Sequence, residues 1–205
     1  MIRSQHRPFF VSFFRIYTTL MIRLHFRGVS FKGEFHDRGL PVLMIGNHFS
    51  WWDGFIAYFI NFRILHRKFH VMMLEEQLTG RKFLNKAGAY SIKRGGRSVI
   101  ESLNYSAELL QKKDNLVVLY PQGEFQSLYS RQVDFEKGIR IIASKINGSI
   151  HLLFYAVLLD YFSHRKQSLT IYIMEMPQEI ASDPARLEQE YNRFLDRCIL
   201  QQKPG

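Results

Sequence analysis

The chain has 205 residues, of which 46% are hydrophobic and 15% aromatic, with a formal net charge of +10 at pH 7. This length and apolar content suit one globular domain with a sizeable core. The charge predicts an anionic partner: a nucleic acid, an anionic lipid surface or a phosphorylated substrate. Cys198 is the single cysteine, which excludes an internal disulfide and a cysteine-based metal site and fits a reducing, cytoplasmic setting.

Residues 8–27 are predicted to form a helix with a narrow polar stripe on an otherwise apolar surface. The polar side chains recur at steps of three or four, at Ser12, Arg15, Thr19, Arg23 and Arg27. The longest charge-free stretch of this segment is shorter than the roughly 20 apolar residues that a spanning helix needs. A secretory signal is also disfavoured, because Arg15 and Arg23 interrupt the apolar region and no small-residue cleavage site follows. We therefore expect residues 1–28 to lie as an amphipathic helix in the membrane interface, with the arginines at the headgroups. The alternative is a core helix packed on the domain, and both can hold in part.

The rest of the chain, residues 29–205, is predicted to be one domain in which strands and helices alternate. The predicted strands are 29–35, 41–45, 71–74, 90–92, 116–120, 150–159 and 169–174. The predicted helices are 53–65, 78–87, 98–112, 135–146 and 184–200, with a loop at 94–97. This alternation indicates an α/β fold in a single domain, with a mixed, mostly parallel sheet flanked by helices.

The segment that follows the second predicted strand contains a candidate base and its orienting carboxylate. His48 stands after Gly46-Asn47, and Asp53 follows five residues later, in the first turn of a helix for which Ser50 is the expected N-cap. An imidazole can take a proton from a hydroxyl near neutral pH, and a carboxylate can hold its correct tautomer. The pair requires His48 to precede the helix and the turn to fold it back over Asp53. Alternatively, Asp53 only caps the helix and His48 is an ordinary loop histidine.

Two further loops carry chemistry. Lys93 and Arg94 stand beside Gly95-Gly96 after a short strand, where an arginine fork and open backbone N–H groups could bind a phosphate. The alternative is a solvated basic turn. The polar loop 120–127 follows another strand, and ligands of α/β sheets gather at such carboxyl ends. It could equally be an ordinary connection.

The order of these segments resembles that of the lysophospholipid acyltransferases of the 1-acyl-glycerol-3-phosphate acyltransferase type. That family carries Asn-His-x4-Asp, Gly-x3-Ile-x-Arg, Phe-Pro-Glu-Gly-Thr-Arg-Ser and Phe-x-Lys-Gly, in this order. The corresponding segments here are 47–53, 88–94, 120–127 and 135–138, so the resemblance spans about residues 30–160. It implies a glycerolipid acyltransferase-like fold.

The resemblance also implies an activity. A fatty acyl group would pass from an acyl-CoA or acyl-carrier-protein thioester to a hydroxyl of a lysophospholipid or related amphiphile. His48 would act as general base with Asp53 as its orienter, and Arg94 would hold a phosphate. The residues implied to bind substrate are Asn47, Ser50, Arg94, Gln122, Gly123, Glu124 and Gln126. We expect no metal or cofactor beyond the acyl donor, and a peripheral or monotopic position on the cytoplasmic, anionic face of a membrane.

The third motif departs from the family, since Gln122, Glu124 and Gln126 are taken to replace its Glu, Thr and Arg. Such a loop suits the neutral hydroxyls of a sugar or polyol better than a phosphate monoester. Arg131 could supply the missing cation from nearby. A fourth family motif, a Pro within a strand, has no counterpart in residues 150–154, and His151 is expected to be a plain strand residue.

Other functions remain open at this point. Acylation of a glycolipid or other non-phosphate acceptor would use the same chemistry, and a non-catalytic membrane-lipid-binding protein would explain the charge and the first helix. A nucleic-acid binder lacks a recognisable motif here, so we expect no nucleic-acid partner. An esterase is disfavoured because no Gly-x-Ser-x-Gly elbow occurs.

Overall fold

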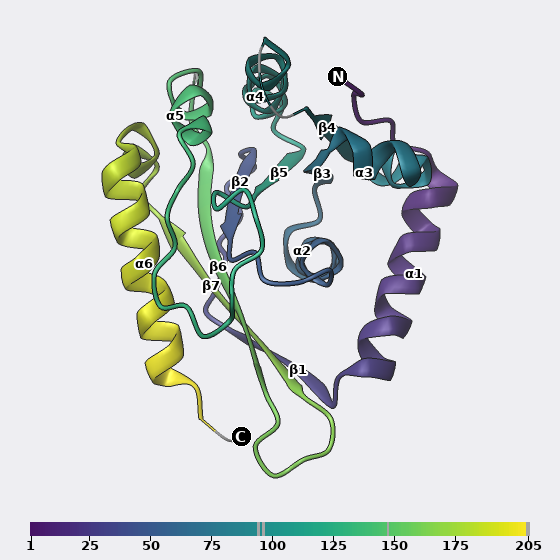
Figure 1. The fold of residues 1–205 in the computed structure, drawn as a ribbon, viewed down its shortest axis with the longest axis vertical. Coiled ribbons are helices and arrows are strands. Elements are labelled where there is room, and N and C mark those ends of the chain that lie inside the picture. Colours follow the sequence, from purple (N-terminus) through teal and green to yellow (C-terminus); the bar gives the residue numbers. More distant parts are fainter. Residues whose placement is uncertain (94, 96, 147, 204–205) are drawn as a thin grey trace.

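The computed structural model describes residues 1–93, 95, 97–146 and 148–203 (Figure 1). These residues form a seven-stranded sheet in the order β1-β7-β6-β2-β5-β3-β4. The strands are β1 (Gly28–Lys32), β2 (Val42–Gly46), β3 (Lys68–Leu74), β4 (Ala89–Ile92), β5 (Asn115–Leu119), β6 (His151–Asp160) and β7 (Ser168–Met176). Neighbouring strands are parallel except for the antiparallel pair β6 and β7. The predicted α/β domain with a mostly parallel sheet is thus confirmed.

Helices cover both faces of this sheet. The α-helices are α1 (Pro8–His25), α2 (Asp53–Ile60), α3 (Glu75–Gly80), α4 (Arg97–Leu109), α5 (Gly138–Ala143) and α6 (Pro184–Gln201). Shorter pieces are the π-helix η1 (Asn61–Leu65) and the 3₁₀-helices η2 (Lys82–Ala87) and η3 (Gln178–Ser182). Figure 1 shows α1 and α6 at opposite sides of the molecule with the strands between them.

The helix predicted at 53–65 is α-helical only up to Ile60 and continues as the π-helix η1. Two other predicted helices also differ from those observed. The helix predicted at 78–87 is broken into α3 and η2 at Arg81, directly after Gly80, which is a poor helix former. Its end at Gly88 is as expected, because Gly88 has φ +118°, a left-handed conformation that favours glycine. The helix predicted at 135–146 is shorter, since α5 begins only at Gly138.

The central strand β2 explains why the sequence 41–45 reads as a continuous apolar run. Leu43 and Ile45 belong to the core on the side of α4, α5 and α6. Val42 and Met44 belong to the core on the side of α1 and α2. Successive strand residues point to opposite faces, so a strand covered on both faces must be apolar throughout. This buried strand fixes the position of the segment that follows it.

Helix α1 packs one face on the domain and exposes another apolar face. Phe14 stacks on Phe83, Tyr17 lies against Phe55, and the hydroxyl of Tyr58 donates to the main-chain oxygen of Val11 at 2.9 Å. The exposed apolar side chains are Phe9, Phe13, Ile16, Leu20 and Leu24. Within the described residues, no helix combines the length and the apolar character required to cross a bilayer. The alternative of a packed helix therefore holds for one face of α1 only.

His151 opens β6 and is fully buried, so it is a strand residue as expected. Its Nδ1 lies 2.6 Å from Glu175 Oε1, and its Nε2 accepts a hydrogen bond from the main-chain nitrogen of Arg38 at 3.1 Å. These contacts anchor the loop between β1 and β2. This loop precedes β2, whereas His48 follows it.

Candidate active site

The carboxyl ends of β2 and β5 bring two loops together. The two strands are adjacent and parallel, with Ile45 opposite Leu119. The loop after β2 contains His48, and the loop after β5 begins at Tyr120. Ligand sites of α/β sheets lie at such strand ends, so a functional site is expected at this edge of the sheet.

His48 and Asp53 form a direct pair. His48 Nδ1 lies 2.7 Å from Asp53 Oδ2, and the same oxygen accepts the main-chain N–H groups of Phe49 at 2.7 Å and Ser50 at 2.9 Å. These bonds fold the turn back over Asp53, as the pair requires. The predicted N-cap is wrong: α2 begins at Asp53 with Trp52 as its N-cap, and Ser50 Oγ instead accepts from the main-chain nitrogen of Trp52 at 2.9 Å.

The two members of the pair differ in their exposure to solvent. The Asp53 side chain is only 1% exposed and that of His48 is 24% exposed. Burial raises the pKa of Asp53, while the hydrogen bonds from His48, Ser50 and Phe49 oppose that rise. Because Asp53 accepts from Nδ1, the Nε2 lone pair of His48 is the free one, and Nε2 has no hydrogen-bond partner among the described residues. The arrangement can accept a proton at Nε2.

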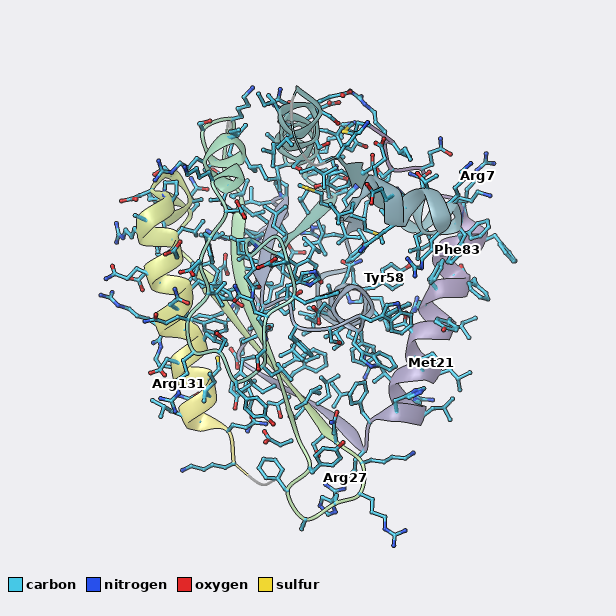
Figure 2. All side chains as sticks on the ribbon, in the orientation of Figure 1. Arg7, Met21, Arg27, Tyr58, Phe83 and Arg131 are labelled. Carbon is cyan, nitrogen blue, oxygen red and sulfur yellow. The ribbon has the colours of Figure 1, made fainter. Side chains whose placement is uncertain are left out.

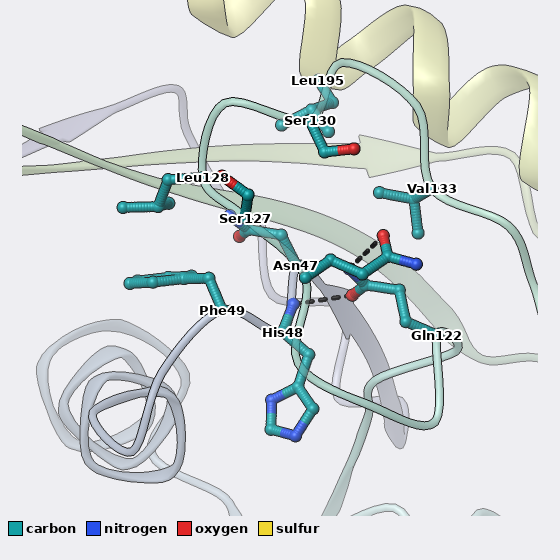
Figure 3. A pocket seen from close by; sticks show the side chains of 10 residues that line it. Asn47, His48, Phe49, Gln122, Ser127, Leu128, Ser130, Val133 and Leu195 are labelled. Carbon is teal, nitrogen blue, oxygen red and sulfur yellow. Dashed lines mark hydrogen bonds between the residues drawn. The ribbon is translucent and has the colours of Figure 1, made fainter.

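The main chain of His48 is fixed by the loop after β5. Its nitrogen donates to Gln122 Oε1 at 2.6 Å, and its oxygen accepts from the main-chain nitrogen of Gln126 at 2.8 Å. Gln122 Nε2 then donates to Gln126 Oε1 at 3.0 Å. Figure 3 shows the His48 nitrogen bonded to the Gln122 side chain. The two glutamines therefore fix the main chain of His48 and are hydrogen-bonded to each other.

Two aromatic rings that sequence reasoning left out of the site pack on the imidazole. The ring centroid of Tyr120 lies 4.4 Å from that of His48 with an interplanar angle of 18°, and Phe125 lies at 4.3 Å. The sequence feature that could have identified these two residues is their position in the loop that directly follows β5. Counting the family motif without a gap corrects one correspondence: Phe125 takes the position of the family's Arg, and Gln126 that of its Ser.

The other residues expected to bind substrate are placed differently. Asn47 is buried and bridges β6, since its Nδ2 donates to the oxygen of Val157 at 3.1 Å and its Oδ1 accepts from the nitrogen of Val157 at 3.0 Å. Gly123 has φ +70°, and a Cβ there would lie 3.1 Å from Glu136 Cγ. Glu124 is exposed beside it. Their roles in substrate binding stay predictions.

Of the two expected cation contacts, only Arg131 can be placed in the structure. Arg94 and the neighbouring Gly96 lie outside the described residues. Arg131 is exposed and lies beside α6, where its Nη1 is 3.5 Å from Asp196 Oδ1 (Figure 2). Arg131 is also absent from the residues that line the small cavity next to His48. The structure thus gives no support to Arg131 as a substitute cation.

That cavity measures about 10 Å³, which is room for about one water molecule. Its lining includes Gln122, Ser130 and Leu195. Figure 3 shows the His48 imidazole pointing away from Ser130 and Leu195, so the cavity lies on the main-chain side of His48. The free Nε2 therefore does not face this cavity. Among the described residues, no group of His, Cys, Asp or Glu side chains is arranged to hold a metal ion.

The sheet and the ordered motifs along it define an acyltransferase domain. A family model described as Acyltransferase matches residues 28–156, more than half of the chain, and the chain belongs to this family. The predicted family is thereby confirmed. A comparison with curated protein sequences finds no match.

A solved structure supports the fold. The chain is similar to the crystal structure of the 1-acyl-sn-glycerophosphate (LPA) acyltransferase PlsC from Thermotoga maritima, with a TM-score of 0.64. The similarity covers 95% of this chain and 81% of that chain at 13% sequence identity. At that identity the likeness concerns the fold, including the N-terminal helix and the sheet that carries His48.

Proposed function

We propose that the protein transfers a fatty acyl group from an acyl-CoA or acyl-carrier-protein thioester to a hydroxyl of a lysophospholipid or related amphiphile. His48 is the general base and Asp53 its orienter. The observation that carries this proposal is the 2.7 Å contact between His48 Nδ1 and the buried Asp53 Oδ2, which leaves Nε2 free. Membership of the acyltransferase family supports the reaction class.

The reaction needs one proton transfer and one displacement. Nε2 takes the proton of the acceptor hydroxyl, and the resulting oxygen attacks the thioester carbonyl. The carbon–sulfur bond breaks, and the thiolate leaves with the proton that His48 returns. Asp53 stabilises the intervening imidazolium, as a buried carboxylate does in hydrolase triads. Base catalysis of this kind contributes about 10²–10⁴-fold, and positioning of the two substrates supplies further acceleration.

The test is His48→Ala, with His36→Ala as the matched control. His36 is 80% exposed in its side chain and lies in the loop that precedes β2. We expect His48→Ala to lose acyl transfer while its circular dichroism and vesicle binding stay unchanged, and His36→Ala to remain active. Normal turnover by His48→Ala would exclude the base role. Absence of transfer in the unaltered protein, with every donor and acceptor tried, would favour a non-catalytic lipid-binding function.

We propose further that residues 1–28 form an interfacial membrane-binding helix and residues 29–205 the acyltransferase domain, on the cytoplasmic face of an anionic membrane. The support is the exposed apolar face of α1, on which Phe9 is 73% and Ile16 69% exposed. Such a face beside arginines binds the boundary between headgroups and acyl chains.

The test of this placement is flotation with vesicles of anionic and of neutral lipid. Ile16→Glu should weaken binding to anionic vesicles, whereas Ile100→Glu should leave it unchanged. Ile100 is a matched control because it is also exposed and apolar, at 49%, but lies on α4. Equal binding by both variants would exclude α1 as the membrane contact.

A second candidate acceptor is a glycolipid or another amphiphile without a phosphate monoester. It is favoured by the neutral Gln122–Gln126 bond and by the aromatic Phe125 at the position of the family's Arg. Transfer to a glycolipid and to lysophosphatidic acid, measured side by side, decides between them. Phe125→Arg should increase relative use of lysophosphatidic acid, whereas Phe125→Leu should not. A preference of the unaltered protein for lysophosphatidic acid would exclude the second candidate.

A further inference from the structure

Three buried polar atoms in or near the His48–Asp53 pair have no hydrogen-bond partner among the described residues. They are Asp53 Oδ1, the Tyr120 hydroxyl and the Tyr155 hydroxyl. A buried carboxylate oxygen without a donor is costly, because it loses its hydration and gains nothing in exchange. A phenol hydroxyl is a suitable donor for it.

The strands on either side of β2 bring both phenols to this region. Tyr120 follows β5, and its ring lies nearly parallel to the His48 ring at 4.4 Å. Tyr155 belongs to β6, and its ring fills the space over Gly46, where a Cβ would lie 2.1 Å from the ring. Gly46 is two residues before His48. The two hydroxyl-bearing rings therefore flank the segment that holds the base.

Electrostatics around Asp53 agree with this placement. Burial raises the pKa of Tyr120 and of Tyr155 well above the ordinary value of 10. The negative charge of Asp53 raises the pKa of Tyr120 further, and the neighbouring Tyr120 and then Asp53 raise that of Tyr155. Both phenols are therefore protonated donors wherever His48 is a neutral base. The titratable groups that face Asp53 are His48, Tyr120, Tyr155 and, from α6, Tyr191. None of the three phenols competes with His48 for the proton.

We propose that Tyr120 is a positioning residue whose hydroxyl donates to Asp53 Oδ1 through a bridging water that it shares with Tyr155. This inference rests on the proposed function of His48 and Asp53. A donor on Oδ1 leaves Oδ2 for His48 Nδ1 and helps to keep the buried carboxylate ionised. The family motif has Phe at this position, so this chain adds a hydroxyl that the family pattern lacks.

The test is Tyr120→Phe, which keeps the ring against His48 and removes only the hydroxyl. Without that donor the carboxylate is harder to keep ionised and holds the imidazolium more strongly. Both effects favour protonation of the pair, so the acid limb of the pH–activity profile should move to higher pH by about one unit. The pKa of His48, followed by NMR of its ring, should rise in the same direction.

Controls separate this inference from a structural effect and from the proposed function itself. Tyr90→Phe removes another buried tyrosine hydroxyl, which contacts Ser106 Oγ at 2.7 Å, and should leave the His48 titration unchanged. Tyr155→Phe should give a shift in the same direction as Tyr120→Phe. Unchanged titration of His48 in both Tyr120→Phe and Tyr155→Phe would overturn the inference. Activity of His48→Ala would instead overturn the proposed function, and the NMR titration would still decide the role of Tyr120.

Discussion

The side chain of Gln122 fixes the main chain of His48, because the His48 nitrogen donates to Gln122 Oε1 at 2.6 Å. Asp53 holds the ring of the same residue at 2.7 Å. The candidate base is thus fixed at both ends, by a residue after β5 and by a residue in the first turn of α2. Neither contact uses Nε2 of His48, so the residue is held in place while Nε2 stays available to accept a proton.

The first prediction concerns Gln122. Gln122→Ala leaves the His48 N–H without its acceptor, which should lower the free energy of unfolding by about 1–3 kcal/mol and reduce turnover by displacing the base. Gln122→Glu keeps an acceptor oxygen and should retain more turnover than Gln122→Ala. Urea unfolding and a transfer assay on both variants provide the measurement. Equal turnover in the two variants would show that the acceptor oxygen is unimportant.

The second prediction separates stability from activity at Asp53. The folded-state pKa of Asp53 is raised, so stability from its protonated form is present at low pH and is lost as pH rises through that pKa. Asp53→Asn does not ionise. Its free energy of unfolding, relative to the unaltered protein, should therefore increase between pH 4 and pH 7, while turnover falls by about 10²–10⁴-fold. Stability curves for both proteins that stay parallel across this range would contradict the prediction.

The third prediction concerns Asn47, which bridges the main chain of Val157 through both ends of its amide. Asn47→Ala leaves a buried N–H and C=O unpaired and should cost about 2–4 kcal/mol of stability. Asn192 makes the same two-bond bridge to Val133, at 2.8 and 3.0 Å, so Asn192→Ala is the matched control. Only Asn47→Ala should also lower turnover, since Asn47 adjoins His48. Equal turnover in the two folded variants would count against this.

The fourth prediction concerns a histidine far from the candidate site in sequence. Burial, and secondarily the neighbouring His6, lower the pKa of His70 from 6.5 to about 3. The fold therefore requires neutral His70, and its stability should fall as pH decreases from 6.5 towards 3, because the unfolded chain binds the extra proton. His70→Gln should make this decline shallower in urea titrations, whereas His36→Gln should not. A decline of the same steepness in both variants would exclude His70 as the source.

Local patterns made much of the fold predictable. Alternating apolar strands and helices indicated the α/β class, and the apolar run 41–45 indicated a buried strand. The His48–Asp53 pair could be predicted because five residues and one turn connect its members. Gln122 could be connected to His48 only through the family motifs, since its contact depends on the parallel pairing of β2 with β5.

Contacts between distant segments could not be predicted. The bridge from Asn47 to Val157 joins residues 110 positions apart, and no local pattern signals it. Arg131 is near the third motif in sequence, yet its guanidinium lies beside Asp196 of α6. The aromatic rings of Tyr120 and Phe125 looked like ordinary loop residues until the fold placed them on the imidazole. In each case the deciding information is which element lies alongside, and this requires the tertiary structure.

The packing of α1 on α2 has a practical consequence for work with this protein. Tyr17 covers Phe55, and Val11 accepts a hydrogen bond from Tyr58, so α1 shields the helix whose first residue is Asp53. Deleting residues 1–28 to obtain a detergent-free protein would uncover this helix and loosen Asp53, whose carboxylate contacts His48. Single polar substitutions on the outer face of α1 are the better route to a soluble sample, because they leave the inner contacts intact.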